Sequence, residues 1–299
     1  MRFSVYQESR IGGRSSNQDR MGYCYTRDAL LILLADGMGG HAGGEIAADI
    51  AMKTLGACFH QGARPRIASP QRFLEDSFFA AHREILRYCT DQHLDESPRT
   101  TIVACLVQDG VAIWAHCGDS RLYWMREGAV LTRTRDHSNI ENLIAQGRVL
   151  PSERATHPER NRLHNCLGAP IAPKVEISRP AMLQTGDLLL LCSDGLWATV
   201  PEPILARELF AHSIVQAVPA LVQKATEIGG KYGDNVTALA MSWDGSGNLE
   251  GAGQPNADAL RKAQEEIAMA EDFSESEIEK AIAEIRAAIE RTGRLPRRS

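Results

Sequence analysis

Short apolar runs recur along the chain, and most are bounded by polar or turn-forming residues. Apolar runs and alternating patterns of this length predict strands. The predicted strands are Phe3–Gln7, Met21–Tyr25, Leu30–Ala35, Thr101–Val107, Val111–His116, Arg121–Met125, Val175–Ile177, Leu188–Cys192 and Val236–Trp243.

Three longer segments carry apolar residues at helical spacing, which predicts amphipathic helices. Their apolar stripes are Ile46, Ala47, Ile50, Ala51, Thr54 and Leu55; Leu74, Phe78, Ala81, Ile85 and Tyr88; and Val215, Val218, Leu221, Val222 and Ala225. The strands come in hairpin-like pairs, and two of the helices lie next to each other between them. This order differs from a regular β-α-β alternation and favours an α+β fold with mainly antiparallel sheets and helices packed outside.

The segment 136–170 is polar and irregular, apart from a short helix predicted near Ile140–Gln146. We expect it to lie on the surface as an inserted loop. Long loops of this kind are often functional.

The character of the chain changes after Trp243. A Gly-rich linker, "DGSGNLEGAGQPN", precedes two predicted helices, one at Ala257–Ala270 and one opening at Ser274 with the capping box "SESE". The second helix carries a stripe of isoleucines: Ile278, Ile282, Ile285 and Ile289. We predict a domain of residues 1–245 and an extension of residues 246–299. The helices of the extension either pack on the domain in cis or serve docking, regulation or dimerisation.

Composition narrows the class of protein. The 299 residues are 43% hydrophobic and 24% charged, with a net charge of -5, which is typical of a globular protein and argues against nucleic-acid binding. Seven scattered cysteines without a C-x-x-C pair fit a reducing compartment. The chain has no apolar signal core and no apolar run long enough for a membrane helix. We therefore expect a cytoplasmic protein without a membrane partner.

Five aspartates flank predicted strands. Asp36 and Asp194 each end an apolar run and precede a glycine, Asp19 and Asp234 stand just before strands, and Asp119 lies between two. Aspartate also favours turns, so turn formation is the alternative interpretation. Turn formation alone does not require an Asp-Gly pair after a long apolar run, and this arrangement occurs twice, which favours a functional site.

Oxygen ligands without a Cys or His cluster select hard cations such as Mg²⁺ or Mn²⁺. Carboxylates from separate strands can hold two ions, which activate water and neutralise an anionic substrate. A nucleotide-binding loop would need a Gly-Lys-Ser/Thr sequence, which this chain lacks. The pattern indicates metal-assisted hydrolysis, most naturally of a phosphate ester.

The motifs around these aspartates resemble those of the metal-dependent protein phosphatases of type 2C (the PPM family), in their bacterial serine/threonine form. In order, they are "GGRSSNQD", "ADGMGGHAGGEIAA", "CGDSRLY", "TRDHS" with "HPERNRLHNCLG", "GDLLLLCSDGLW" and "GDNVTAL". The resemblance covers about Ser9 to Met241. It implies a four-layer α/β/β/α sandwich, with two mainly antiparallel sheets, helices on both outer faces and 136–170 as a flap.

The resemblance also implies roles for the aspartates at a centre of two Mn²⁺ or Mg²⁺ ions. Asp36 would bridge the ions, the Gly37 carbonyl would add a ligand, and Asp194 and Asp234 would complete the coordination of the second ion. Asp19 would support the site directly or through water. Asp119 resembles the residue that helps to hold a weaker third ion.

Arg14 and His41 match the positions of the other catalytic residues. The resemblance implies that Arg14 binds the substrate phosphate, for which a guanidinium fork is suited. His41 would protonate the leaving alkoxide, or else it only hydrogen-bonds the turn. His137 is more often structural. Gln18 departs from the family, because a glutamate is usual there and a neutral amide adds no charge to the centre.

The resemblance implies a serine/threonine phosphoprotein phosphatase that uses water and forms no phosphoenzyme. Its substrates would be phosphorylated proteins, and a serine/threonine kinase is one candidate partner. Two alternatives stay open. One is a catalytically weak phosphoprotein-binding domain of the same fold, and the other is a hydrolase of small phosphate monoesters.

Overall fold

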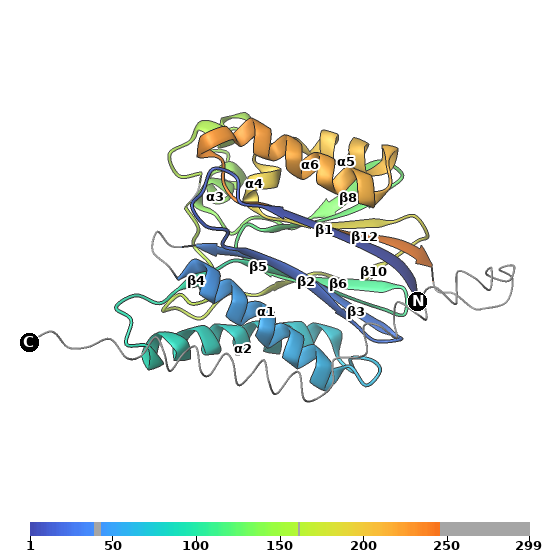
Figure 1. The fold of residues 1–299 in the computed structure, drawn as a ribbon, viewed down its shortest axis with the longest axis horizontal. Coiled ribbons are helices and arrows are strands. Elements are labelled where there is room, and N and C mark those ends of the chain that lie inside the picture. Colours follow the sequence, from blue (N-terminus) through green and yellow to red (C-terminus); the bar gives the residue numbers. More distant parts are fainter. Residues whose placement is uncertain (39–42, 161, 246–299) are drawn as a thin grey trace, which may run out of the picture. The chain divides into compact units, whose positions relative to one another are not determined.

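The computed structural model describes residues 1–38, 43–160 and 162–245, which belong to one compact unit, Met1–Gly247. Within it, two antiparallel sheets lie face to face, and helices cover the outer face of each (Figure 1). The α+β fold class and the four-layer sandwich predicted above are confirmed.

The first sheet has the strand order β1-β12-β11-β7-β8. These strands are β1 (Arg2–Arg10), β12 (Val236–Gly245), β11 (Leu188–Cys192), β7 (Arg121–Arg126) and β8 (Ala129–Arg133). Its outer face carries α4 (Asp194–Trp197), α5 (Glu202–Ala211) and α6 (Ile214–Gly229).

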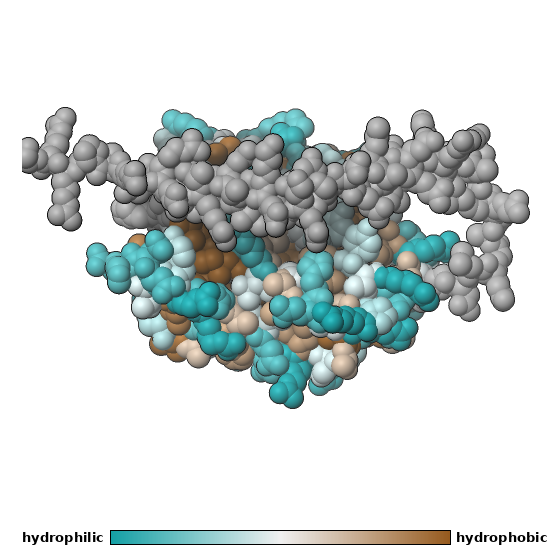
Figure 2. Space-filling view, turned by 60° about the horizontal axis from the view of Figure 1, so that its bottom comes forward, coloured by the Kyte–Doolittle hydropathy of each residue, from teal (hydrophilic) through white to brown (hydrophobic). Residues whose placement is uncertain are grey.

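The second sheet has the order β10-β6-β5-β3-β2, with β4 paired to β3 and β9 paired to β6. The strands are β2 (Asp19–Tyr25), β3 (Ala29–Met38), β4 (Arg99–Thr100), β5 (Ile102–Gln108), β6 (Val111–Cys117), β9 (Glu176–Ile177) and β10 (Ala181–Met182). Helices α1 (Gly44–Gly62) and α2 (Pro70–Asp91) cover it. Toward solvent, the side of the molecule that carries these two helices mixes hydrophilic and hydrophobic residues (Figure 2).

Strand β3 shows why the apolar run at residues 30–35 is uninterrupted. Leu30, Ile32 and Leu34 pack between the two sheets. Leu31, Leu33 and Ala35 pack instead under α1 and α2. Both faces of the strand are therefore buried, which selects apolar residues at every position.

All nine predicted strands and the three predicted helices are present, but the sequence missed several elements. Strands β4 and β10 are only two residues long, and the edge strand β8 is largely exposed, so none has a clear apolar pattern. Helix α5 was also missed.

The buried stripe of α6 begins at Ile214 instead of Val215, which is 57% exposed. The predicted flap helix is α3 (Asn139–Ala145), followed by the 3₁₀ helix η1 (Pro151–Thr156). The two predicted C-terminal helices lie outside the described residues.

The strand register gathers the acidic motifs at one end of the sandwich. Asp19, at the start of β2, lies directly opposite Asp36 near the end of β3. Asp194 follows β11, and Asp234 precedes the neighbouring strand β12. Asp119 lies in the turn between β6 and β7, which belong to different sheets.

Glycine at position 195 is needed where the turn after β11 meets the start of β12. A Cβ added at Gly195 would lie 2.0 Å from the backbone oxygen of Asn235. A Cβ at Gly229, near the end of α6, would meet nothing within 4 Å.

We predict that Gly195→Ala lowers the free energy of unfolding by about 2 kcal/mol or more, because two backbone segments must separate. Gly229→Ala, the matched control, should change it by less than about 1 kcal/mol in the stabilising direction, since alanine favours helix. Denaturant unfolding measures both. Equal effects would contradict the proposed backbone contact.

Candidate metal centre

A cleft of about 750 Å³ opens at this end of the sandwich. Four of the five predicted aspartates line it, together with the predicted phosphate ligand and the predicted carbonyl ligand. These lining residues are Arg14, Asp36, Gly37, Asp119, Asp194 and Asp234. The fifth aspartate, Asp19, pairs with Asp36 across β2 and β3. The structure thus brings together every aspartate singled out from the sequence.

Asp19 is 4% exposed, and only one of its two carboxylate oxygens has a hydrogen-bond partner among the described residues. Its Oδ2 accepts a hydrogen bond of 2.8 Å from Ser193 Oγ, whereas its Oδ1 is buried and has no hydrogen-bond partner in the described part of the chain. Burying an oxygen without a partner costs free energy. A cation is the partner that suits an unpaired carboxylate oxygen among other carboxylates.

The pKa shifts of the clustered aspartates also indicate a cation-binding site. Burial, followed by repulsion from neighbouring aspartates, raises the pKa of Asp36 and the pKa of Asp194 well above the ordinary value. Burial and repulsion from Asp136 raise the pKa of Asp119 to about 7, although Arg121 opposes the rise. Like charges held together away from water disfavour ionisation, and bound cations would remove that cost.

Arg14 now neutralises one member of the cluster. Its Nε and Nη2 donate to Oδ1 and Oδ2 of Asp234 at 2.9 and 2.6 Å. This fork raises the pKa of Arg14, mainly through the hydrogen bond and charge of Asp234. The guanidinium lies in the cleft and is 56% exposed, but Asp234 occupies its fork.

The glycine-rich turn lets two backbone segments touch behind the cluster. A Cβ at Gly37 would lie 2.2 Å from the backbone oxygen of Gly44, at the start of α1. Gly37 N also donates to the carbonyl of Gln18 at 3.2 Å. Only glycine allows this approach, which brings the first turn of α1 beside Asp36.

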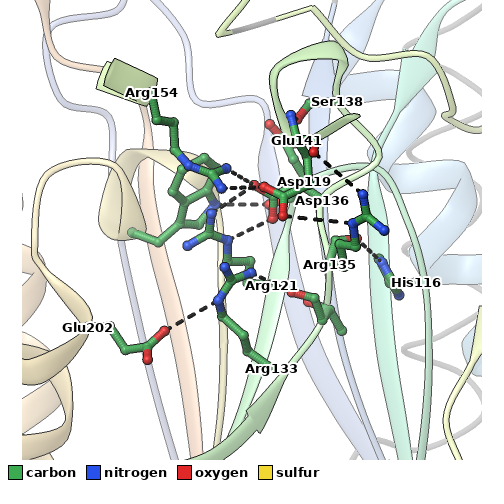
Figure 3. A network of polar contacts seen from close by, with 12 residues as sticks. His116, Asp119, Arg121, Arg133, Arg135, Asp136, Ser138, Glu141, Arg154 and Glu202 are labelled. Carbon is green, nitrogen blue, oxygen red and sulfur yellow. Dashed lines mark hydrogen bonds and ion pairs between the residues drawn. The ribbon is translucent and has the colours of Figure 1, made fainter. Parts of the chain in front are cut away.

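A second network, which the sequence did not reveal, supports Asp119 (Figure 3). Arg121 donates to both oxygens of Asp136 at 2.8 and 2.7 Å, and its guanidinium lies 3.6 Å from the ring centroid of Trp197. Trp197 Nε1 in turn donates to the Asp119 carbonyl at 2.9 Å. Arg154, in η1 of the flap, donates to Asp136 at 3.0 Å and also binds Glu141 of α3. Side-chain networks of this kind depend on tertiary contacts and leave no motif of fixed spacing.

Several other residues line the cleft without having been predicted to do so. Arg99, Arg162, Leu163 and Cys166 come from β4 and the flap, and Glu45, in the first turn of α1, also lines it. His137 is not among the lining residues, which agrees with its structural interpretation. Its Nδ1 accepts from Gly118 N at 3.2 Å. His41 lies outside the described residues.

Comparison with known proteins identifies the family to which this site belongs. A model described as protein phosphatase 2C matches residues 6–226. The chain belongs to the protein phosphatase 2C family. Family membership confirms the resemblance drawn from the motifs and the predicted enzyme class, a protein phosphatase.

Bacterial members of the 2C family are similar over most of the chain. The serine/threonine phosphatase Stp of Listeria monocytogenes is 30% identical over 235 residues, which span 77% of this chain and 92% of that protein. Serine/threonine phosphatase Stp1 of Staphylococcus aureus has a crystal structure with a TM-score of 0.74 at 27% identity, covering 82% of this chain and 96% of that one. The catalytic domain of the phosphatase PstP, solved with two manganese ions, has a TM-score of 0.68 at 27% identity over 80% and 97% of the two chains.

The 2C family is metal-dependent, and the aspartate cluster fits that requirement. Its donors are all oxygens, one of them is buried and unpaired within the described residues, and the carboxylates repel one another. This donor set suits Mg²⁺ or Mn²⁺.

Two further observations bear on the sequence predictions. All seven cysteines are free. Among the described residues, no helix combines the length and the apolar character that crossing a bilayer requires.

The raised carboxylate pKa values predict how stability depends on pH when no ion is bound. The pKa of Asp119 is about 7 in the folded state, against an ordinary value of 3.8. Between these values the folded state binds more protons than the unfolded state, so the free energy of unfolding falls as pH rises. For Asp119 alone, the loss between pH 4 and pH 8 is about 2–4 kcal/mol.

We expect Asp119→Asn to flatten this slope, because an amide does not ionise. Denaturant unfolding in the presence of a chelator, repeated over the pH range, measures it. Asp95→Asn, at an exposed aspartate outside the cluster, is the control and should keep the wild-type slope. A wild-type stability that rises from pH 5 to 8 under these conditions would overturn the interpretation.

Proposed function

We propose that this chain is a serine/threonine phosphoprotein phosphatase that hydrolyses phosphate monoesters at the aspartate-lined cleft. The observation that carries the proposal is the convergence of five aspartates and Arg14 at one end of the sandwich. We assign catalysis to residues 1–245, with 136–170 as the flap. The domain boundary and the role of residues 246–299 remain predictions.

We assign the metal ligands among the carboxylates of this cluster. Asp36 lines the cleft and is repelled by the other four aspartates, so it is suited to bridge two ions, with the Gly37 carbonyl as a neighbouring ligand. Asp194 and Asp234 complete the centre. Asp19 offers its unpaired Oδ1 directly or through water. Asp119 lines the same cleft, and we assign it to a weaker third ion.

When bound, Mn²⁺ or Mg²⁺ ions supply Lewis acidity at the phosphate and a nucleophile from water near neutral pH. The protein itself contributes by orienting the groups that contact the phosphate and the ions. Arg14 turns its fork from Asp234 toward the phosphate oxygens, where it stabilises the charge of the transition state. The backbone contact of Gly37 with Gly44 keeps Asp36 fixed during the reaction.

No thiol is a suitable nucleophile in this cleft. Cys166 is the cysteine that lines it, and burial raises the pKa of its thiol. A protonated thiol reacts poorly. Direct attack by water, without a phosphoenzyme, therefore fits the site. Protonation of the leaving oxygen by His41 stays a prediction, because His41 lies outside the described residues.

The proposed substrates are proteins phosphorylated on serine or threonine, among them a serine/threonine kinase. An elongated peptide can enter because the cleft is open and carries Arg99 and Arg162 beside the aspartates. A cytoplasmic location and the absence of nucleic-acid and membrane partners also stay predictions.

The decisive experiment measures phosphate release with Mn²⁺ from a phosphothreonine peptide, a phosphotyrosine peptide and a small aryl phosphate. We expect kcat/KM to be highest for the phosphothreonine peptide and Asp36→Asn to lower it by about a thousandfold, because the ions lose their shared ligand. Asp95→Asn is the control and should retain activity. Binding of the peptide without release would indicate a phosphoprotein-binding domain. Release from the aryl phosphate alone would indicate a small-molecule hydrolase.

Arg14 can be tested separately from the ions. We expect Arg14→Ala to lower kcat/KM by about a hundredfold, because the phosphate loses a charged fork. Arg14→Lys should restore only part of the loss, since an ammonium is a point charge. The Mn²⁺ affinity of Arg14→Ala, measured by calorimetry, should equal or exceed that of the wild type, because Asp234 loses its competing cation. A weaker Mn²⁺ affinity would contradict this role.

A further inference from the structure

A second cleft, of about 600 Å³, opens on the side of the sandwich among β6, β7, β8 and β9. His116 and Glu176 line it, and they face each other in the register of β6 and β9. His137 packs beside them, at the start of the flap. One donor atom from each of His116, His137 and Glu176 lies within 4.8 Å of the other two.

His116 has an unused lone pair. Its Nε2 lies 2.7 Å from the carbonyl of Arg135, which can only accept, so Nε2 carries the proton (Figure 3). Nδ1 is then an acceptor, and it is buried without a hydrogen-bond partner in the described part of the chain. The residue is only 2% exposed. A buried acceptor without a donor needs an explanation, and a missing ion is one.

His137 and Glu176 complete the group. The ring of His137 stacks on His116 with the centroids 4.4 Å apart. Its Nε2 lies 3.3 Å from Glu176 Oε2. Its Nδ1 accepts from Gly118 N at 3.2 Å and from Asn165 Nδ2 at 2.7 Å, so the ring is held from its far side.

We propose that His116, His137 and Glu176 form a second metal site that binds Zn²⁺, apart from the aspartate centre. Two imidazoles and one carboxylate match the ligand set of open zinc sites, whereas the aspartate centre offers only oxygens. With Zn–N distances of about 2.0–2.1 Å, ligand atoms of a tetrahedral site lie about 3.3 Å apart. The distance between His137 Nε2 and Glu176 Oε2 already has this value. A ring nitrogen of His116 lies within 4.8 Å of donor atoms of both other residues, so binding requires its ring to reorient toward the ion.

The protonation states favour a cation here. Burial lowers the pKa of His116, and burial together with the neighbouring His116 lowers the pKa of His137 to about 4. Both rings are therefore neutral near pH 7. Zinc displaces the proton from His137 Nε2 to solvent, while Nδ1 keeps its two donors. The cleft leaves the fourth coordination position to water.

The site is linked to the aspartate centre through a short path. Gly118, whose N–H donates to His137, immediately precedes Asp119. The ring that would hold zinc thus also holds the turn that carries Asp119. Occupancy of the second site should change the position of that turn.

The test measures zinc bound to the full chain by equilibrium dialysis and metal analysis, with millimolar Mg²⁺ present to fill the aspartate centre. We expect one Zn²⁺ per chain. Glu176→Gln, at a half-exposed side chain that should not impair folding, should weaken binding at least about tenfold. His116→Gln should abolish it. His164→Gln is the matched control, because its ring lies beside His137 but outside the ligand set.

Co²⁺ in place of zinc gives a second readout. In the presence of Mg²⁺, the wild type should show the intense visible absorption of a tetrahedral cobalt site, and Glu176→Gln should lose it. Zinc binding that is unchanged in both Glu176→Gln and His116→Gln would overturn the proposal. So would zinc that Asp36→Asn removes and His116→Gln does not, since that zinc would occupy the aspartate centre. Phosphatase activity with Mn²⁺ is a separate measurement, so the two proposals can fail independently.

Discussion

Mutual repulsion among closely placed carboxylates is the constraint on which this structure depends. Five aspartates approach one another at the end of a closely packed sandwich, where partial burial and the neighbouring negative charges oppose their ionisation. The fold tolerates this arrangement because the strand pairing on each side is extensive. The ends of β2 and β3 are fixed by seven paired positions, Asp19 opposite Asp36 among them. The repulsive cluster is thus held by core packing elsewhere, as is typical of sites that bind cations.

Much of the fold could be predicted because the central strands of both sheets are short, continuous apolar runs. The runs at Leu30–Ala35 and Leu188–Cys192 are apolar throughout, since each strand lies between two packed layers. Strand β8 escaped prediction because it lies at a sheet edge and buries little. In the stripe of α6 only the first residue was wrong, because Ile214 and Val215 are both apolar and only tertiary packing distinguishes them.

The acidic residues of the site were predictable for a related reason. Each aspartate stands at the end of a strand that sequence alone could locate, and antiparallel pairing brings such ends together. The residues that brace the site were not predictable. Arg121 comes from β7, whereas Asp136 and Arg154 come from the flap, and only the folded chain brings them together. The pairing of His116 with His137 is of the same kind, because no spacing in the sequence indicates that the two rings stack.

The contact between Arg14 and Asp234 has a kinetic consequence under the proposed roles. A single guanidinium cannot serve the carboxylate and a phosphate with the same fork. If Asp234 serves as a metal ligand, bound ions would compete with Arg14 for its oxygens, and the fork would become free to bind the substrate phosphate once it leaves Asp234. The enzyme would accordingly follow an ordered sequence, with the ions first and the phosphoprotein second, and an ion-depleted molecule would hold its own phosphate receptor closed.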